Sequence, residues 1–241
     1  MLLALASATA FSPPARPVLA CWAPPRAPVP VALSPSGVDG LPLASQAGLF
    51  ASTFVALGAS ATVIDRGYAA MRGKSWPWDL WESGAALLLG AIFMTAGRSH
   101  FTMPEAFIAI YPPQGTWGFW YLPGSPEFHV AWTGVAELSG GAGLLTGGLL
   151  DAAALAGRGT APSALRVAAA RGLLLLVFCV TPANFLMFSH GATMPGVVEG
   201  PLAMEWHLAR FVAQVSVLSV LLTLSALGGQ NVKAEASEVG S

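Results

Sequence analysis

Ionisable side chains interrupt the long apolar stretches of this chain at only a few positions. The most prominent is Glu137, which lies well inside the apolar stretch 131–150, AWTGVAELSGGAGLLTGGLL. A carboxylate in hydrocarbon is costly, so such a residue usually marks a function, a buried partner, or both. Glu137 is therefore the first candidate for holding or transferring a proton inside a membrane.

The other strongly polar groups cluster toward matching ends of neighbouring apolar stretches. Spacings of three and four residues place His207, Arg210 and Gln214 on one helix face. If successive helices alternate in direction, these groups and Glu137 fall in the same half of the membrane. We therefore predict a polar pocket beneath loops 99–128 and 191–203, with Glu137 paired to Arg210. Its predicted residues are Arg98, His100, Glu137, Asn184, His190, His207, Arg210 and Gln214.

A structural role for the same residues is the alternative, because polar side chains often hold membrane helices together. For the individual histidines, interfacial hydrogen bonding is the simpler interpretation. No pair of His or Cys residues has a metal-binding spacing, so no metal site is predicted. Cys21 and Cys179 lie in different kinds of segment, so we expect neither a disulfide nor dithiol chemistry.

Composition identifies the class of protein that must position these groups. The chain has 241 residues, of which 54% are hydrophobic and 10% charged, whereas a soluble domain carries about 25% charge. The net charge of −1 provides no field that would recruit nucleic acid. We therefore expect an all-α membrane protein.

Four apolar stretches are long enough to span a bilayer and predict a transmembrane four-helix bundle within residues 80–227. They are 80–97, 129–150, 165–190 and 204–227. An additional N-terminal transmembrane helix is predicted at 43–64, followed by a basic loop at 65–79. We also expect a short interfacial helix at 103–111 and a loop at 151–163.

Small residues on the predicted helices indicate how closely the helices approach one another. Gly140, Gly143 and Gly147 recur at helical spacing on the second strong span. Ser83, Ala86, Gly90 and Gly97 form a similar stripe on the first. Both stripes predict close helix–helix packing.

The two ends of the chain are predicted to lie outside the fold. Residues 1–42 combine a short apolar run with a proline-rich, acid-poor segment, and residues 228–241 form a polar tail. The N-terminal segment resembles the bipartite presequence of proteins imported into the secondary red plastids of algae. This resemblance implies a multi-pass protein of a plastid membrane, either thylakoid or envelope. An ordinary secretory signal, leading to another endomembrane, is the alternative.

Four ordered motifs resemble the DoxX and DoxX-like membrane proteins. They are GRSHFTMPEAFIAIYPP from Gly97, GVAELSGGAGLL from Gly134, TPANFLMFSHG from Thr181, and ARFVAQ from Ala209. The resemblance covers residues 80–227 and implies a four-helix core. Some members are similar to a subunit of thiosulfate:quinone oxidoreductase. Others are linked to membrane redox or thiol-stress complexes, and distant relatives act as assembly factors.

Pocket and resemblance together favour a membrane redox component that binds a quinone, with lipid as its surroundings. No motif for a flavin, haem or nicotinamide is present, so a partner protein would have to bring electrons. A non-enzymatic accessory or assembly subunit of a larger plastid complex is the alternative, and no catalytic residue is assigned. A solute carrier and a pigment-binding protein are weaker alternatives, since the chain lacks broken repeated halves and a repeated pigment motif.

Overall fold

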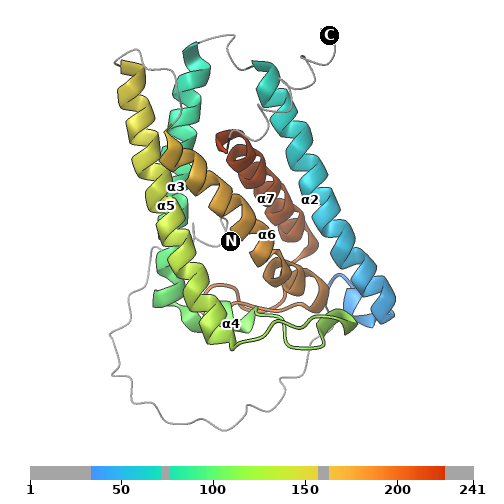
Figure 1. Ribbon diagram of the computed structural model, residues 1–241. Helices are drawn as coiled ribbons and strands as arrows, with labels where there is room; N and C mark the ends of the chain where they lie inside the picture. Colours follow the sequence, from blue (N-terminus) through green and yellow to red (C-terminus); the bar gives the residue numbers. More distant parts are fainter. Residues whose placement is uncertain (1–33, 72–75, 157–162, 226–241) are drawn as a thin grey trace, which may run out of the picture.

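The computed structural model describes residues 34–71, 76–156 and 163–225, and the regular elements in these ranges are helices (Figure 1). Five of them are long and apolar enough to cross a membrane: α2 (Leu43–Met71), α3 (Trp76–Thr102), α5 (Pro126–Ala156), α6 (Ala164–His190) and α7 (Met204–Leu224). The short elements η1 (Val38–Gly40), α4 (Pro104–Ala109) and η2 (Thr116–Gly118) gather at one end of the bundle. The predicted all-α membrane bundle is confirmed.

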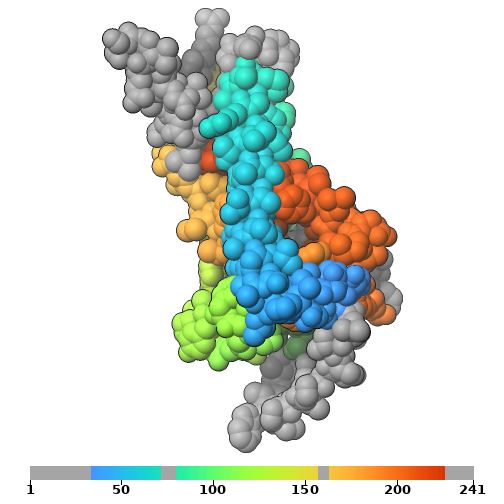
Figure 2. Space-filling view, turned by 90° about the vertical axis from the view of Figure 1, so that its right-hand side faces the viewer, coloured from blue at the N-terminus to red at the C-terminus, as the bar shows by residue number. Residues whose placement is uncertain are grey.

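The order of packing separates four core helices from one peripheral helix. Helix α5 lies between α3 and α6, α6 packs on α7, and α2 lies along the outside of α7. Figure 2 shows α2 crossing this face with α6 to one side and α7 to the other. The protein is therefore a multi-pass integral membrane protein whose outer helix faces contact lipid.

Glycine allows α5 to approach both of its neighbours at backbone distance. A Cβ added at Gly97 on α3 would lie 2.8 Å from the Gly134 carbonyl oxygen on α5. A Cβ at Gly147 would lie 2.6 Å from the Arg166 amide nitrogen at the start of α6. Close packing through the predicted glycine stripes is thus seen on both sides of α5.

Helix α2 continues beyond the predicted end of its span. Residues 65–71, expected to begin a loop, extend the helix to Met71, and α3 already begins at Trp76. Asp65 is buried, and its carboxylate accepts a hydrogen bond of 2.7 Å from Thr223 Oγ1 on α7. This hydrogen bond comes from a segment far away in the sequence. It gives a partner to the Asp65 carboxyl group, which the neighbouring residues alone would lead one to expect in solvent. The basic residues predicted at 72–75 lie outside the described residues.

Helix α5 also runs further than predicted, to Ala156, so Asp151 belongs to the helix rather than to a loop. Its carboxylate lies 3.0 Å from Arg166 Nε and accepts a 2.6 Å hydrogen bond from the Ser163 amide. Arg166 Nη1 lies 3.4 Å from Glu82 Oε2 on α3. We call Glu82, Asp151 and Arg166 the ionic cluster. It joins α3, α5 and α6 at the end of the bundle opposite α4.

Residues 34–42, just before α2, pack against the end of α6. Residues 34–42 belong to the predicted disordered segment, yet the hydroxyls of Ser34 and Ser36 each donate a 2.7 Å hydrogen bond to the Phe188 carbonyl on α6. Both residues therefore hold the start of the described chain against the end of α6. Residues 1–33 of the predicted 1–42 presequence, and 226–241, which contain the predicted tail, lie outside the described residues.

The loop between α4 and α5 is anchored by a buried tryptophan, Trp117. Trp117 is only 1% exposed, and its Nε1 donates a 3.0 Å hydrogen bond to Ser189 Oγ on α6. Its ring lies 4.7 Å from Phe50 on α2 and 5.2 Å from Phe185 on α6. The loop is thereby fixed between α2 and α6 and can form a defined wall.

Candidate functional site

A cavity of about 160 Å³ lies among α3, α5, α6 and α7, at the end of the bundle that carries α4. Phe107, Tyr111 and Trp120 of the 103–125 segment and Met194 of the 191–203 loop contribute to its wall. Both loops predicted to roof the pocket therefore contribute. Most of the remaining lining is aliphatic or aromatic, so the few polar side chains stand out.

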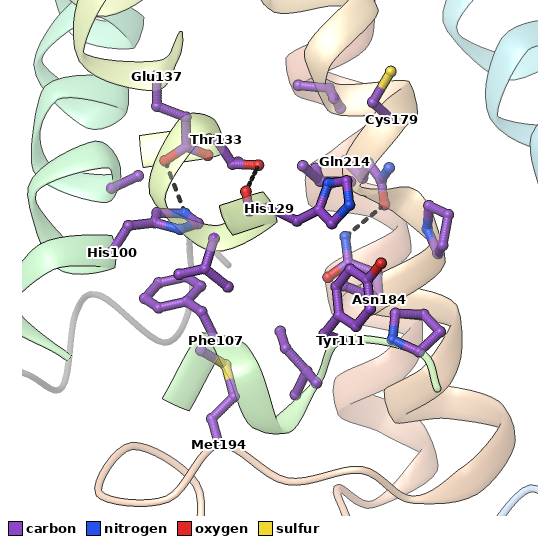
Figure 3. Close-up of a pocket in the computed structure, with 18 of the residues that line it drawn as sticks. His100, Phe107, Tyr111, His129, Thr133, Glu137, Cys179, Asn184, Met194 and Gln214 are labelled. Carbon is purple, nitrogen blue, oxygen red and sulfur yellow. Dashed lines mark hydrogen bonds and ion pairs between the residues drawn. The ribbon is translucent and has the colours of Figure 1, made fainter. Parts of the chain in front are cut away.

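One polar wall consists of Glu137 on α5 and His100 on α3 (Figure 3). Their exposed fractions are 1% and 5%, and Oε2 of Glu137 lies 3.3 Å from Nε2 of His100. The His100 ring stacks on Phe107, with the ring centroids 3.8 Å apart. Neither of the two facing atoms has a hydrogen-bond partner among the described residues. The pair thus places an imidazole and a carboxyl group in contact and keeps hydrogen-bonding capacity inside the cavity.

The facing wall is a hydrogen-bonded chain on α6 and α7, which we call the amide wall. Arg210 Nη2 donates to Asn184 Oδ1, and Asn184 Nδ2 donates to Gln214 Oε1 at 3.2 Å. Gln214 Nε2 then donates to Thr181 Oγ1 at 2.7 Å. Arg210 Nε has no partner within the described part of the chain. Figure 3 shows Asn184 and Gln214 across the cavity from Glu137 and His100.

Tyr111 also lines the cavity and carries a hydroxyl without a hydrogen-bond partner in the described ranges. Its ring stacks on His129, with centroids 5.4 Å apart. His129 is fully engaged, because Nε2 donates to the Pro123 carbonyl at 2.8 Å and Nδ1 accepts from Trp132 Nε1 at 3.1 Å. Burial raises the pKa of Tyr111 above its ordinary value, so this hydroxyl keeps its proton and can donate it in a hydrogen bond.

The cavity opens sideways toward lipid. Helices α5 and α6 touch near Gly147 and Arg166 and diverge toward the α4 end (Figure 1). Trp132 on α5 and Cys179 on α6 line the cavity and are also exposed on the outer surface. A lipid-soluble molecule can therefore enter between these helices without crossing the loops.

The structure brings together most, but not all, of the predicted pocket residues. Those that line the cavity are His100, Glu137, Asn184, Arg210 and Gln214. His207 lines a second cavity, on the other side of the amide wall. His190 contacts Ser189 Oγ at 2.8 Å and lines neither cavity, and Arg98 is exposed.

The predicted pairing of Glu137 with Arg210 is wrong, because Glu137 contacts His100 and Arg210 donates to an amide. Position along a span predicts the depth of a side chain, but the direction in which each side chain points depends on helix rotation. The preference of α5 for α3, imposed by their glycines, turns Glu137 toward His100.

Sequence reasoning missed Tyr111, Trp120, His129 and Thr133, all of which line the cavity. His129 and Thr133 carry a signal that was available, since they precede Glu137 by eight and four residues and so share its helix face. For Tyr111 and Trp120 the sequence contains no such periodic signal, because their positions depend on how the loop folds back over the bundle.

The contact between His100 and Glu137 predicts strong energetic coupling. We expect His100→Gln and Glu137→Gln, combined, to change the free energy of unfolding non-additively, by about 0.5–3 kcal/mol. Glu137→Gln combined with Arg210→Gln should be additive within about 0.5 kcal/mol. Unfolding in mixed micelles measures both cycles. Coupling to Arg210 without coupling to His100 would contradict the observed pairing.

No protein-family model, curated protein or solved structure matches this chain. The resemblance to DoxX-like proteins therefore stays a prediction. Within the described ranges, no group of three His, Cys, Asp or Glu side chains is placed to hold a metal ion.

Proposed function

We propose that this integral membrane protein is a DoxX-like, redox-associated component of a plastid membrane that binds a quinone in the cavity. This proposal is supported mainly by the two polar walls, which face each other across an apolar cavity open to lipid. A quinone head group is a flat apolar ring with a carbonyl acceptor at each end. Such a molecule needs donors on two sides and hydrophobic contacts between them.

Unpartnered donors in the cavity support this fit. Tyr111 Oη, Trp120 Nε1 and Arg210 Nε are buried, line the cavity, and lack a hydrogen-bond partner in the described part of the chain. Buried polar groups are normally hydrogen-bonded, so orphaned donors in one cavity favour an acceptor-bearing ligand. On the wall formed by Glu137 and His100, His100 can donate when its ring is protonated at Nε2.

The residues also have suitable roles in proton handling. A bound quinone would supply two-electron, two-proton redox chemistry, with a partner redox protein as source or sink of the electrons. Glu137 and His100 can hold and exchange a proton inside the membrane. Asn184 and Gln214 keep the Arg210 guanidinium fixed at the opposite wall. The protein thus provides binding, orientation and proton transfer.

Tyr111→Phe should weaken quinone binding by about fivefold or more, because it removes one donor and nothing else. Titration of the purified protein with a short-chain benzoquinone, followed by quenching of tryptophan fluorescence, measures the dissociation constant. Tyr121→Phe is the matched control, since Tyr121 is 69% exposed in the same loop. It should bind as the unaltered protein does.

Failure of the unaltered protein to bind quinone would overturn the proposal. If the protein then migrates with a large complex in mild detergent, the accessory-subunit alternative is favoured. Absorption spectroscopy of the same preparation separates both outcomes from a pigment-binding role.

A further inference from the structure

A second cavity, of about 290 Å³, lies on the opposite face of the amide wall. Thr53 on α2, Thr181 and Phe188 on α6, and His207 and Phe211 on α7 contribute to its lining. Asn184, Arg210 and Gln214 line both cavities. Figure 2 views the molecule from the α2 side, where α2 crosses beside α7.

Arg210 gives this second cavity an uncompensated positive charge. The guanidinium donates to the neutral amide of Asn184, and no carboxylate within the described residues lies in ion-pair contact with it. Glu137 contacts His100 instead, and Glu205, on the first turn of α7, is exposed and lines neither cavity. A largely buried cation in a membrane is costly unless an anion approaches it.

His207 supplies a second polar group at this cavity. Its ring already bonds to the Leu202 backbone, so Nε2 donates when both ring nitrogens carry a proton. His207 is 9% exposed and lines the cavity, and its Nε2 has no hydrogen-bond partner among the described residues. Met204 places the first turn of α7 at the cavity. The amide dipoles there add a partial positive charge that favours an anion. Arg210 and the helix start thus favour an anion, and the protonated His207 ring can donate to it through Nε2.

The surroundings of these groups are those of a lipid. Met204 and Leu208 line the cavity and are 47% and 64% exposed on the outer surface of α7. Phe188 and Phe211 give the inner wall an aromatic surface. An acyl chain can therefore lie along α7 while its head group enters the cavity.

We propose that the cavity between α2, α6 and α7 binds the anionic head group of a membrane lipid through Arg210 and His207. The shared chemistry is a carboxylate or phosphate oxygen that accepts hydrogen bonds from the Arg210 guanidinium and from Nε2 of the protonated His207 ring. The site is separate from the proposed quinone cavity, although Arg210 borders both. His207 and Tyr111 each line only one of the two.

Native mass spectrometry of the full chain in mild detergent tests this proposal. The probes are phosphatidylglycerol, oleic acid and zwitterionic phosphatidylcholine. We expect an anionic lipid to bind at least about tenfold more tightly than phosphatidylcholine. Preference for oleic acid would identify a carboxylate head, and preference for phosphatidylglycerol a phosphate head. Equal binding of all three overturns the proposal.

Two variants locate the binding. His207→Phe keeps the aromatic contact with Phe188, whose ring centroid lies 5.5 Å away, and should lose most of the anionic preference. Arg210→Met should lose it as well, whereas Arg98→Met, an exposed arginine on α3, should keep it. An unchanged preference in His207→Phe would overturn the site even if Arg210→Met fails to fold. Tyr111→Phe should leave lipid binding intact, so failure of the quinone proposal is distinguishable.

Discussion

Replacing Arg166 with methionine should lower the free energy of unfolding by about 3–5 kcal/mol, the usual cost of removing one partner of a buried ion pair. Arg166 is 4% exposed and contacts the carboxylates of Asp151 and Glu82. Methionine keeps the length of the side chain but leaves the Asp151 carboxylate, itself buried, without its cation. Unfolding by dodecyl sulfate in mixed micelles measures the loss.

Arg98→Met is the matched control, because Arg98 is an exposed arginine on a spanning helix. It should change the free energy of unfolding by less than about 0.5 kcal/mol. The double variant Arg166→Met, Asp151→Leu should recover part of the loss, since it removes the stranded charge. Equal losses for Arg166→Met and Arg98→Met would show that the ionic cluster does not stabilise the bundle.

Gly97→Ala should destabilise the protein by about 1–3 kcal/mol, which is typical of overpacking. The added Cβ would lie 2.8 Å from both the Gly134 carbonyl oxygen and the Leu138 amide nitrogen. Both are backbone atoms of α5, so the helices themselves would have to move apart. Thermal unfolding in detergent measures the effect.

Gly84→Ala provides the control for this substitution within the same helix. A Cβ at Gly84 meets no atom within 4 Å, and the position is exposed. Its stability should stay level or rise slightly, because alanine favours helix over glycine. A similar loss at both positions would mean that α3 and α5 do not pack at backbone distance.

The fold could be predicted largely from hydropathy and small-residue spacing. Three of the four strong spans fall within α3, α5 and α6, and the additional N-terminal span falls within α2. The fourth, predicted at 204–227, begins with α7, which ends at Leu224. The helix ends that were missed depend on distant partners. Asp65 continues α2 because Thr223 binds its carboxylate, and Asp151 continues α5 because Arg166 does. When only the neighbouring residues are considered, both aspartates indicate the end of a membrane span.

The cavity was accessible from sequence only in part. Depth in the membrane follows from position along each span, so Glu137, Asn184 and Arg210 are predicted to share one pocket, and all three line the cavity. Which side chain meets which depends on helix rotation and on backbone contacts such as that at Gly97. The donors from the loops, Tyr111 and Trp120, depend on the anchoring of Trp117 beneath Ser189. Helix rotation and the anchoring of this loop produce no periodic pattern in the sequence, so they could not be predicted from it.

The odd number of spanning helices in the described chain puts the start of α2 and the end of α7 at opposite ends of the bundle. Residues 34–42, 103–125 and 191–203 all lie at the α4 end, whereas α7 finishes at the opposite end (Figure 1). Loops from the first of these ends alone cover the cavity. A water-soluble protein that serves this cavity must therefore reside in the single compartment that those loops face.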